Sequence, residues 1–401
     1  MKKRDYYLDQ LVSYQDKPFI KVITGMRRCG KSSLLSLFED YLISSGVKKD
    51  HIIRMNFESM ANDRIQEYHA LYDAITEKMP FKKTRYYLLL DEVQLVESWE
   101  KAVNSLLVDA KVDIYLTGSN AFLLSSELST LLSGRYVEIK MLPLSFKEYL
   151  DFIDVPKTSN PDEYFQTYLL YGGLPSITML IANPETITAF LTGIYNTVIM
   201  KDVVQRNMVR DAALLDSVLR FLASNVGNIV STKKISDYLT SSGRKTNSDT
   251  IDNYIRMLES AFIIYRVNRF DLKGKQYLKT QEKFYMVDTG IRYSLTGQRN
   301  TDYGHILENV VYLELLRRGY EVAIGKVGTL EIDFVATKSD ERLYYQVSAT
   351  ILDPTTRDRE LAPLQAIKDN YKKIILTMDK SVFNDYEGIT SINIIDFLLS
   401  K

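Results

Sequence analysis

The chain has 401 residues, enough for two or three domains, and its 45% hydrophobic and 25% charged residues are typical of a globular protein. Its 51 basic side chains balance 51 acidic ones, which excludes a uniformly basic protein that coats nucleic acid but leaves local patches open. A single cysteine, Cys29, excludes an internal disulfide framework, and with only three histidines the chain has no Cys/His cluster for structural zinc.

The N-terminus and the apolar segments bear on location. The first ten residues, MKKRDYYLDQ, are basic and aromatic and lack the apolar core of a signal peptide. No apolar run reaches membrane-spanning length. We therefore expect a cytoplasmic protein with no membrane partner.

Short apolar runs alternate with helical patterns over the first 150 residues. Five runs are typical of buried strands: FIKVIT (19–24), HIIRMNF (51–57), RYYLLLD (85–91), DIYLTGS (113–119) and YVEIKM (136–141). Amphipathic stretches such as 31–45 and 97–109 lie between them. Strands that alternate with helices predict an α/β fold with a doubly wound parallel sheet.

The stretch GMRRCGKS (25–32) has the spacing of a phosphate-binding P-loop, and it follows a predicted strand and opens a predicted helix. The glycines let backbone amides point at phosphate, and the helix adds its positive N-terminal end. We expect Lys31 to reach the β- and γ-phosphates and Ser32 to bind Mg²⁺. The residues predicted to line the nucleotide, several through their backbone, are Gly25, Arg28, Cys29, Gly30, Lys31, Ser32 and Ser33.

A second motif follows the third strand. YYLLLDEV is a buried run that ends in Asp91 and Glu92, at the strand end that would face the nucleotide. We expect Asp91 to act on Mg²⁺ through a water molecule and Glu92 to polarise the attacking water. The alternative is a pair of acids that begin a solvated turn. Strand 51–57 intervenes in sequence between the P-loop and this motif, and 113–119 follows. This ordering resembles that of the P-loop proteins with an extra central strand and a catalytic glutamate.

Three further polar residues are candidates for this site. Ser119 and Asn120 end the fourth strand, where they could orient water or sense the γ-phosphate, or simply cap a helix. Arg135 could be an arginine finger, supplied in cis or by a neighbouring subunit, or a plain surface residue.

The middle of the chain changes character. Residues 145–225 are nearly all helical in pattern, interrupted by YGGLP (171–175). A helix-turn-helix-like region (232–260) is followed by two predicted strands around Gly274. Helices followed by a hairpin predict a winged helix.

The motifs together resemble a known family. GMRRCGKSSLL, LLLDEVQ, LTGSN, LSGRY, YGGLP, ILENVVYLELLRRG and EIDFVA resemble the AAA-like P-loop ATPases of bacteria and archaea, close to the STAND group. The resemblance spans essentially the whole chain. It implies an ATPase module, a helical and winged-helix middle, and a C-terminal domain similar to the PD-(D/E)XK nuclease fold. It also favours ATP over GTP.

Residues 233–283 hold eleven basic residues against six acidic ones. In a winged helix, one helix enters the major groove of DNA and the wing contacts phosphate. Lys273, Lys275, Lys279 and Lys283 lie in or beside the predicted wing, and Arg244, Lys245 and Arg256 lie in or near the second helix of the pair. The alternative is a scaffold winged helix whose lysines are only solvated.

The C-terminal region has acids in the order of a restriction-type metal site. Glu308, Asp333 and Gln346 occupy the ligand positions implied by the resemblance. The lysine expected two residues after the third ligand is replaced by Ser348. We therefore expect a degenerate site that recognises a partner and does not cleave DNA.

These observations predict an ATP-dependent switch that couples nucleotide state to a nucleic-acid partner, with Gly172–Gly173 as its moving joint. A signalling ATPase with a protein partner and an ATP-regulated metal-dependent nuclease are the alternatives, and an oligomer is compatible with each of these functions. The predicted domains are a P-loop ATPase core (1–155), a helical lid (156–210), a winged helix (211–300) and a nuclease-like α/β domain (301–401).

Overall fold

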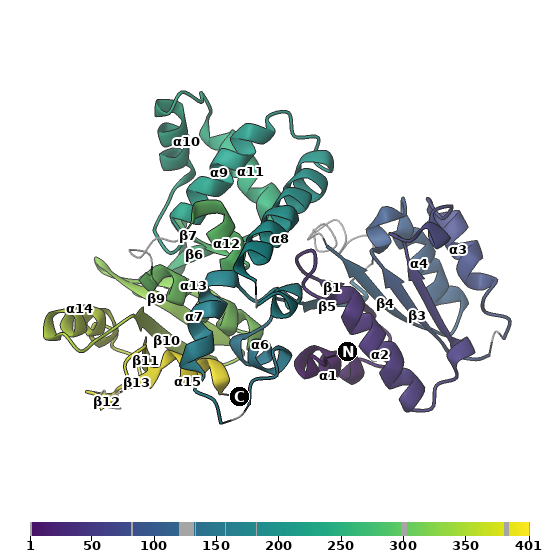
Figure 1. Cartoon of the computed structure of the whole chain (residues 1–401), viewed down its shortest axis with the longest axis horizontal. Coiled ribbons are helices and arrows are strands. Elements are labelled where there is room, and N and C mark those ends of the chain that lie inside the picture. The colour runs from purple at the N-terminus through teal and green to yellow at the C-terminus, as the bar shows by residue number, and fades with distance from the viewer. Residues whose placement is uncertain are drawn as a thin grey trace. The chain divides into compact units, whose positions relative to one another are not determined.

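The computed structural model describes residues 2–81, 83–119, 132, 134–156, 158–181, 183–297, 303–380 and 385–400. The chain forms two compact units (Figure 1). The first comprises the chain up to Met141 together with residues 260–262, and the second comprises the rest from Leu142. The first unit is thus shorter than the predicted 1–155 domain. The reason is that α6 (Phe146–Phe152) packs against α7 (Asp162–Tyr171) and α15 (Ile394–Leu399), which belong to the second unit.

The first unit is built on a five-stranded parallel sheet with the order β2-β3-β4-β1-β5. Its strands are β1 (Ile20–Thr24), β2 (Ile52–Asn56), β3 (Tyr86–Asp91), β4 (Val112–Gly118) and β5 (Tyr136–Lys140). Its described helices are α1 (Asp5–Ser13), α2 (Lys31–Ser44), α3 (Tyr68–Thr76) and α4 (Trp99–Asp109), with 3₁₀ turns at Lys49–His51, Met60–Asn62 and Val93–Leu95. The predicted parallel sheet and its five strands are confirmed. β4 lies between β1 and β3, so the extra central strand is also present.

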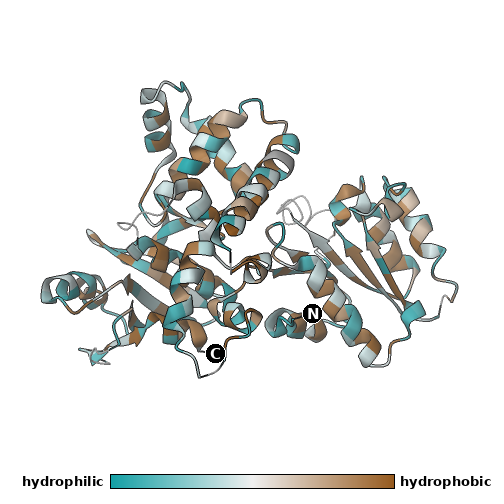
Figure 2. Cartoon of the chain, viewed as in Figure 1, coloured by the Kyte–Doolittle hydropathy of each residue, from teal (hydrophilic) through white to brown (hydrophobic). Residues whose placement is uncertain are grey.

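Both faces of this sheet are buried. Because side chains alternate along a strand, Leu88 and Leu90 of β3 pack into the core under α3 and α4, whereas Tyr87 and Leu89 pack against α1 and α2 on the other face. The result is three layers, helix on sheet on helix. Figure 2 shows the strands of this sheet coloured mostly as hydrophobic.

The second unit begins with a helical region. Its helices are α6 and α7, then η5 (Pro175–Met179), α8 (Pro184–Thr197), the π-helical segment Val198–Gln205, α9 (Ala212–Ser224), α10 (Thr232–Ser241), α11 (Ser248–Ser260) and α12 (Thr289–Thr296). The predicted helical stretch from 145 to 225 and the helix pair at 232–260 are therefore confirmed.

A large mixed sheet follows, with the order β12-β13-β11-β10-β9-β8-β6-β7. Its strands are β6 (Ile264–Asp271), β7 (Gln276–Met286), β8 (Glu321–Val327), β9 (Leu330–Lys338), β10 (Glu341–Ser348), β11 (Lys372–Thr377), β12 (Asp385–Tyr386) and β13 (Ile389–Asn393). The helix α14 (Pro354–Gln365) packs on one face, and α13 (Tyr303–Arg317) and α15 pack against the same strands.

The hairpin β6–β7 turns around Gly274 as predicted, but it is not a free wing. β6 pairs in parallel with β8, with Arg269, Phe270 and Asp271 opposite Ile324, Gly325 and Lys326. The predicted boundary between residues 300 and 301 therefore separates strands of one continuous sheet. Pairing of β6 with β8 joins strands more than 50 residues apart, which no local pattern reveals.

The predicted moving joint at Gly172–Gly173 is closely packed. The carboxylate of Asp288 accepts hydrogen bonds from the backbone N–H of Gly173 (2.7 Å) and of Ile291 (3.1 Å), so it joins the end of α7 to the start of α12. A Cβ on Gly173 would lie 2.4 Å from the carbonyl oxygen of Leu144. Close approach of backbones explains the paired glycines here.

One helix is longer and more apolar than expected, since the sequence was expected to hold no apolar run of membrane-spanning length. The helix Pro184–Gln205 has 22 residues and contains an apolar window of 18 residues, so by length and composition it could cross a membrane. One such helix is weak support for a span, because the apolar core helix of a water-soluble protein has the same properties, and 44% of that window is buried in the fold.

Candidate nucleotide site and a second polar pocket

The predicted P-loop begins at a glycine that no other residue could replace without a clash. Gly25 directly follows β1 with a φ of +144°, and a Cβ there would lie 2.2 Å from the carbonyl oxygen of Met141. Arg28 and Gly30 also have positive φ, at 66° and 106°, so the chain curls back before α2 begins at Lys31. The loop therefore leads into a helix N-terminus, the backbone arrangement that binds phosphate.

Lys31 is the buried cation of this loop, with 3% of its surface exposed. Its Nζ donates to the carbonyl oxygens of Gly25 (3.0 Å) and Met26 (3.1 Å) and lies 3.8 Å from Oε1 of Glu92. Phosphate oxygens carry charge and are stronger acceptors than carbonyls. Lys31 can therefore exchange these loop contacts for a nucleotide.

Asp91 ends β3, fully buried, with both carboxylate oxygens engaged by neighbouring strands. The Thr117 hydroxyl of β4 donates to Oδ1, and the Asn56 amide of β2 donates to Oδ2 at 3.2 Å. Thr117 Oγ1 also accepts the backbone N–H of Glu92 at 2.9 Å. Because β4 lies beside β3, one threonine holds both acidic residues in place.

Glu92 adopts a left-handed backbone conformation (φ 56°), which directs the chain sharply away from β3. Its Oε2 accepts hydrogen bonds from the Ser119 hydroxyl (3.1 Å) and the Gln94 amide (2.5 Å). The structure thus brings Lys31, Glu92 and Ser119 together from three separate segments. Asn120 lies outside the described residues.

The remaining predicted residues of the P-loop differ in their exposure to solvent. Arg28, Ser32 and Ser33 are exposed at the start of α2, where a ligand can reach them. Cys29 is fully buried, and burial raises the pKa of its thiol, so it packs and does not react. An exposed Ser32 hydroxyl and the Asp91 carboxylate, both at the carboxyl edge of the sheet, are oxygen donors of the kind that Mg²⁺ takes.

Sequence reasoning missed Arg4. This buried arginine donates from Nη1 to the carbonyl oxygen of Cys29 at 3.1 Å and so stabilises the P-loop. Its position just before α1, 25 residues away, carried no local signal.

Arg135 does not belong to this cluster. It precedes β5, and its carbonyl oxygen accepts the backbone N–H of Ile20, the first residue of β1. The P-loop follows the last residue of β1, so the strand separates the two by roughly 13 Å at about 3.3 Å per residue. The cis arginine finger is therefore wrong, because parallel pairing places Arg135 at the amino edge of the sheet. A role in a neighbouring subunit stays a prediction.

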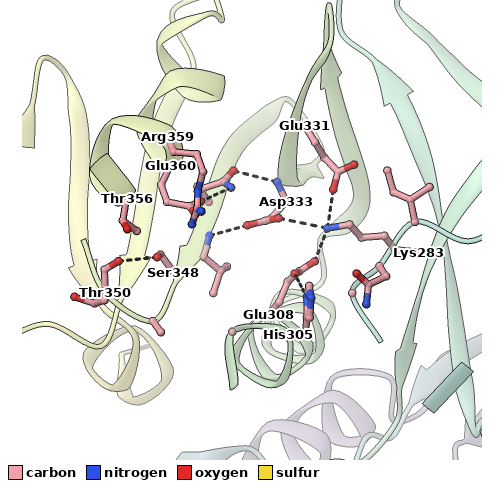
Figure 3. Close-up of a pocket in the computed structure, with 17 residues that line it drawn as sticks. Lys283, His305, Glu308, Glu331, Asp333, Ser348, Thr350, Thr356, Arg359 and Glu360 are labelled. Carbon is pink, nitrogen blue, oxygen red and sulfur yellow. Dashed lines mark hydrogen bonds and ion pairs between the residues drawn. The ribbon is translucent and has the colours of Figure 1, made fainter. Parts of the chain in front are cut away.

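A second polar site lies in the second unit, in a pocket of about 670 Å³ (Figure 3). Lys283 of β7 points into it, and its Nζ lies 2.8 Å from Glu308 Oε1, 2.9 Å from Glu331 Oε1 and 3.4 Å from Asp333 Oδ1. Lys283 lies in the predicted hairpin, but its side chain is buried among acids and does not contribute to an exposed basic wing. Its strand is paired into the sheet, and its side chain is 4% exposed.

The charged groups of this pocket shift one another's pKa values. Burial lowers the pKa of Lys283, but Glu308, Asp333 and Glu331 outweigh burial and raise it, so the amine stays an ammonium. Burial raises the pKa of Glu308, but Lys283 and its hydrogen-bond donors outweigh it, and the net pKa is lowered. Burial and the neighbouring Glu308 charge raise the pKa of Asp333 to about 7.

The predicted ligand Gln346 is engaged elsewhere. Its Oε1 accepts the backbone N–H of Asp333 (3.3 Å), and its Nε2 donates to Glu360 (2.9 Å). Ser348 donates to the carbonyl oxygen of Thr350 at 2.9 Å. Across the described residues, no three His, Cys, Asp or Glu side chains are grouped to hold a metal ion. A lysine amine is nevertheless present, from β7 instead of position 348.

The basic surplus of residues 233–283 is partly internal. Arg266 forms ion pairs with Asp252 (2.9 Å) and Glu259 (3.3 Å), and Arg269 is buried beside Gln281. Among the side chains that the structure describes here, the exposed basic residues are Lys233, Lys234, Arg244, Lys245, Arg256, Lys273 and Lys275, and the side chain of Lys279 lies outside the described ones.

Two family models match successive parts of the chain. A family model described as "AAA domain" matches residues 17–150, and one described as "Domain of unknown function (DUF8612)" matches residues 162–302. The first unit therefore has an AAA-like P-loop ATPase fold. A Haemophilus influenzae protein named "Uncharacterized protein" is 45% identical over 400 residues, covering 100% of this chain and 99% of its own. "Uncharacterized protein MJ1544" of Methanocaldococcus jannaschii is 32% identical, covering 94% and 85%.

Solved structures are similar at lower identity. The Aeropyrum pernix ORC1 protein in complex with DNA aligns over 74% of this chain and 92% of its own, at 14% identity and a TM-score of 0.34. AMPPCP-bound DnaA from Aquifex aeolicus aligns over 63% and 85%, at 16% identity and a TM-score of 0.34.

Proposed function

The chain belongs to the family represented by these H. influenzae and M. jannaschii proteins and carries an AAA domain, and we propose that it binds ATP with Mg²⁺ and hydrolyses it. The observation that carries the proposal is the convergence of Lys31, Glu92 and Ser119 beside Asp91, at the edge of the sheet where the P-loop ends. A cytoplasmic location is part of the proposal.

The chain's own residues divide the work. Bound Mg²⁺–ATP supplies the reactive phosphoryl group and a countercharge, held by Ser32 and Asp91. Lys31 exchanges the carbonyls of Gly25 and Met26 for phosphate oxygens. Glu92, oriented by Ser119 and Gln94, accepts a hydrogen bond from a water and so directs its lone pair.

The direct test is phosphate release by the full chain with Mg²⁺–ATP. Wild type should hydrolyse ATP, and Asp91→Asn should not, although the substitution keeps shape and the Thr117 and Asn56 partners nearby. Failure of the wild type both to bind and to hydrolyse ATP would refute the proposal.

For the output of the switch, we propose a nucleic-acid partner that binds the second unit. The region α9–α10–α11–β6–β7, with Val230 bridged to Glu282 of β7, has the element order of a winged helix and supports this proposal. Most of the exposed basic residues lie on α10, on the turn after it and at the tip of the β6–β7 hairpin. α11 exposes Asp249, and its exposed Arg256 forms an ion pair with Asp252 (2.8 Å).

A salt titration of DNA binding tests this partner. Phosphate contacts should make log K fall with log salt by about 0.9 per contact. The combined variant Lys233→Ala, Lys234→Ala, Arg244→Ala and Lys245→Ala should reduce the slope by roughly 3 to 4. Lys372→Ala, exposed on β11, is the matched control. Binding that is absent or independent of salt would favour the alternative, a protein-regulated signalling ATPase.

A further inference from the structure

The Lys283 pocket holds three carboxylates around one ammonium. Glu308 comes from α13, Glu331 and Asp333 come from β9, and Lys283 comes from β7, so three elements meet at one nitrogen atom (Figure 3). A sheet neighbour, Tyr285, also donates its hydroxyl to Glu308. Lys283, Glu308 and Asp333 are each less than 10% exposed, so water contributes little to their solvation. Buried carboxylates at this density need a cation.

A restriction-type site would meet that need with one or two divalent metal ions. Here the residues do not fit such an ion. Metal–oxygen distances are about 2.0–2.6 Å, so an ion bound to Glu308 and Asp333 would sit against the ammonium that already contacts both. The other oxygen of Asp333 accepts the backbone N–H of Val347 at 2.9 Å. The predicted third ligand, Gln346, is bonded to Asp333 N–H and Glu360.

We propose that the Lys283 ammonium is the resident cation of this pocket and takes the place of the divalent metal ion. Its three donor hydrogens match the three carboxylates that surround it. A lysine on a rigid, paired strand cannot leave as a metal ion can. The pocket is therefore permanently metal-free and does not cut DNA. The proposal does not depend on ATP hydrolysis by the first unit.

The test is Mn²⁺ binding to the full chain without nucleotide, measured by the electron paramagnetic resonance of free Mn²⁺. Wild type and Asp333→Asn should bind equally, because no ion occupies the pocket. Lys283→Met removes the ammonium and should raise Mn²⁺ affinity by at least about tenfold, since a like charge no longer repels the ion. Adding Asp333→Asn to Lys283→Met should abolish the gain. Lys372→Met, exposed on the same sheet, should behave as wild type.

Lys283→Met leaves three acids without a countercharge, so this variant could fold poorly. Thermal unfolding then provides a second measurement. Mn²⁺ should raise the Tm of Lys283→Met and leave that of wild type unchanged. If the variant does not fold even with Mn²⁺, the comparison of wild type with Asp333→Asn decides alone. Two results would overturn the proposal. One is Mn²⁺ binding by wild type that is lost in Asp333→Asn, and the other is Mn²⁺-dependent plasmid cutting by wild type that is lost in the same variant.

Discussion

Lys31 and Glu92 lie 3.8 Å apart but serve different steps of the proposed reaction. Lys31 carries a charge complementary to phosphate before and during hydrolysis, so it contributes to binding. Glu92 is an acceptor oriented by Ser119 and Gln94, and it acts when water attacks. Substitutions should therefore separate binding from turnover.

We expect Lys31→Ala to weaken ATP binding by roughly 10- to 100-fold, since a charge-assisted contact is worth about 1.5–3 kcal/mol. Glu92→Gln should keep the wild-type affinity and lower the hydrolysis rate by about 10²–10⁴-fold. Equilibrium binding and single-turnover hydrolysis measure the two effects. Hydrolysis by Glu92→Gln at the wild-type rate would show that the glutamate does not act on water.

Asp288 predicts a pH dependence of stability. Burial raises its pKa from 3.8 to about 6, although backbone N–H groups partly oppose the rise. The folded state thus holds the proton more tightly than the unfolded state, so this contribution is full below pH 3.8 and is lost as pH rises through about 6. A shift of about two units corresponds to about 3 kcal/mol.

The check is denaturant unfolding of wild type and Asp288→Asn at pH 4 and pH 7.5. Asparagine does not titrate, so the free energy of unfolding of wild type relative to the variant should fall by up to about 3 kcal/mol between these values. A constant difference would mean that Asp288 titrates normally in the folded protein.

At the scale of elements, paired glycines let α7, α12 and the 142–144 segment approach one another. Gly173 meets the Leu144 carbonyl, and its N–H bonds Asp288. Gly193, in the middle of α8, has no atom within 4 Å of its Cβ position. Gly173 has no room for a side chain, whereas Gly193 has open space at its Cβ position. Alanine substitutions at the two positions therefore form a matched pair.

Gly173→Ala should destabilise the second unit by about 1–3 kcal/mol, because the new methyl group forces the backbones apart. Gly193→Ala should stabilise it by about 0.4–1 kcal/mol, because alanine favours the helix and restricts the unfolded chain. Thermal unfolding compares both with wild type. Equal effects of the two substitutions would contradict the packing argument.

For the whole molecule, one of the points where the chain passes between the two units, after Met141, lies beside the P-loop. Met141 donates its N–H to the carbonyl oxygen of Thr24 at 2.7 Å, and its own carbonyl faces Gly25. Three residues later, the N–H of Leu144 bonds the Gly173 carbonyl (2.7 Å). Residues 141–144 therefore run along the chain from the P-loop to the Asp288 junction.

We expect hydrogen exchange at 140–146 to differ between apo, ADP and non-hydrolysable ATP states, because a switch requires unequal binding of ATP to two conformations. Partner affinity should differ between the ATP and ADP states by about 1–3 kcal/mol. Arg317→Ala, which removes the 2.7 Å bond to the Pro143 carbonyl, should reduce that difference without changing ATP affinity. Identical exchange in all three states would leave an ATPase without a switch.

The sequence by itself determined the features that depend on neighbouring residues. The P-loop, the buried strand ending in Asp91 and Glu92, and the five strands of the parallel sheet all follow from short-range sterics and from the alternation of apolar residues. The hairpin at Gly274 is local in the same way. These predictions hold because a turn or a strand needs no distant partner to be recognised.

Only the tertiary structure decided which distant residues meet. Parallel pairing of β5 with β1 placed Arg135 at the edge opposite the P-loop. Pairing of β6 with β8 brought Lys283 to Glu308 and Asp333, although its sequence context is that of an exposed wing. Arg4 reaches Cys29 from outside the motif. Strand order is set by the burial of whole faces of a sheet, a sum over many residues that no single stretch of sequence displays.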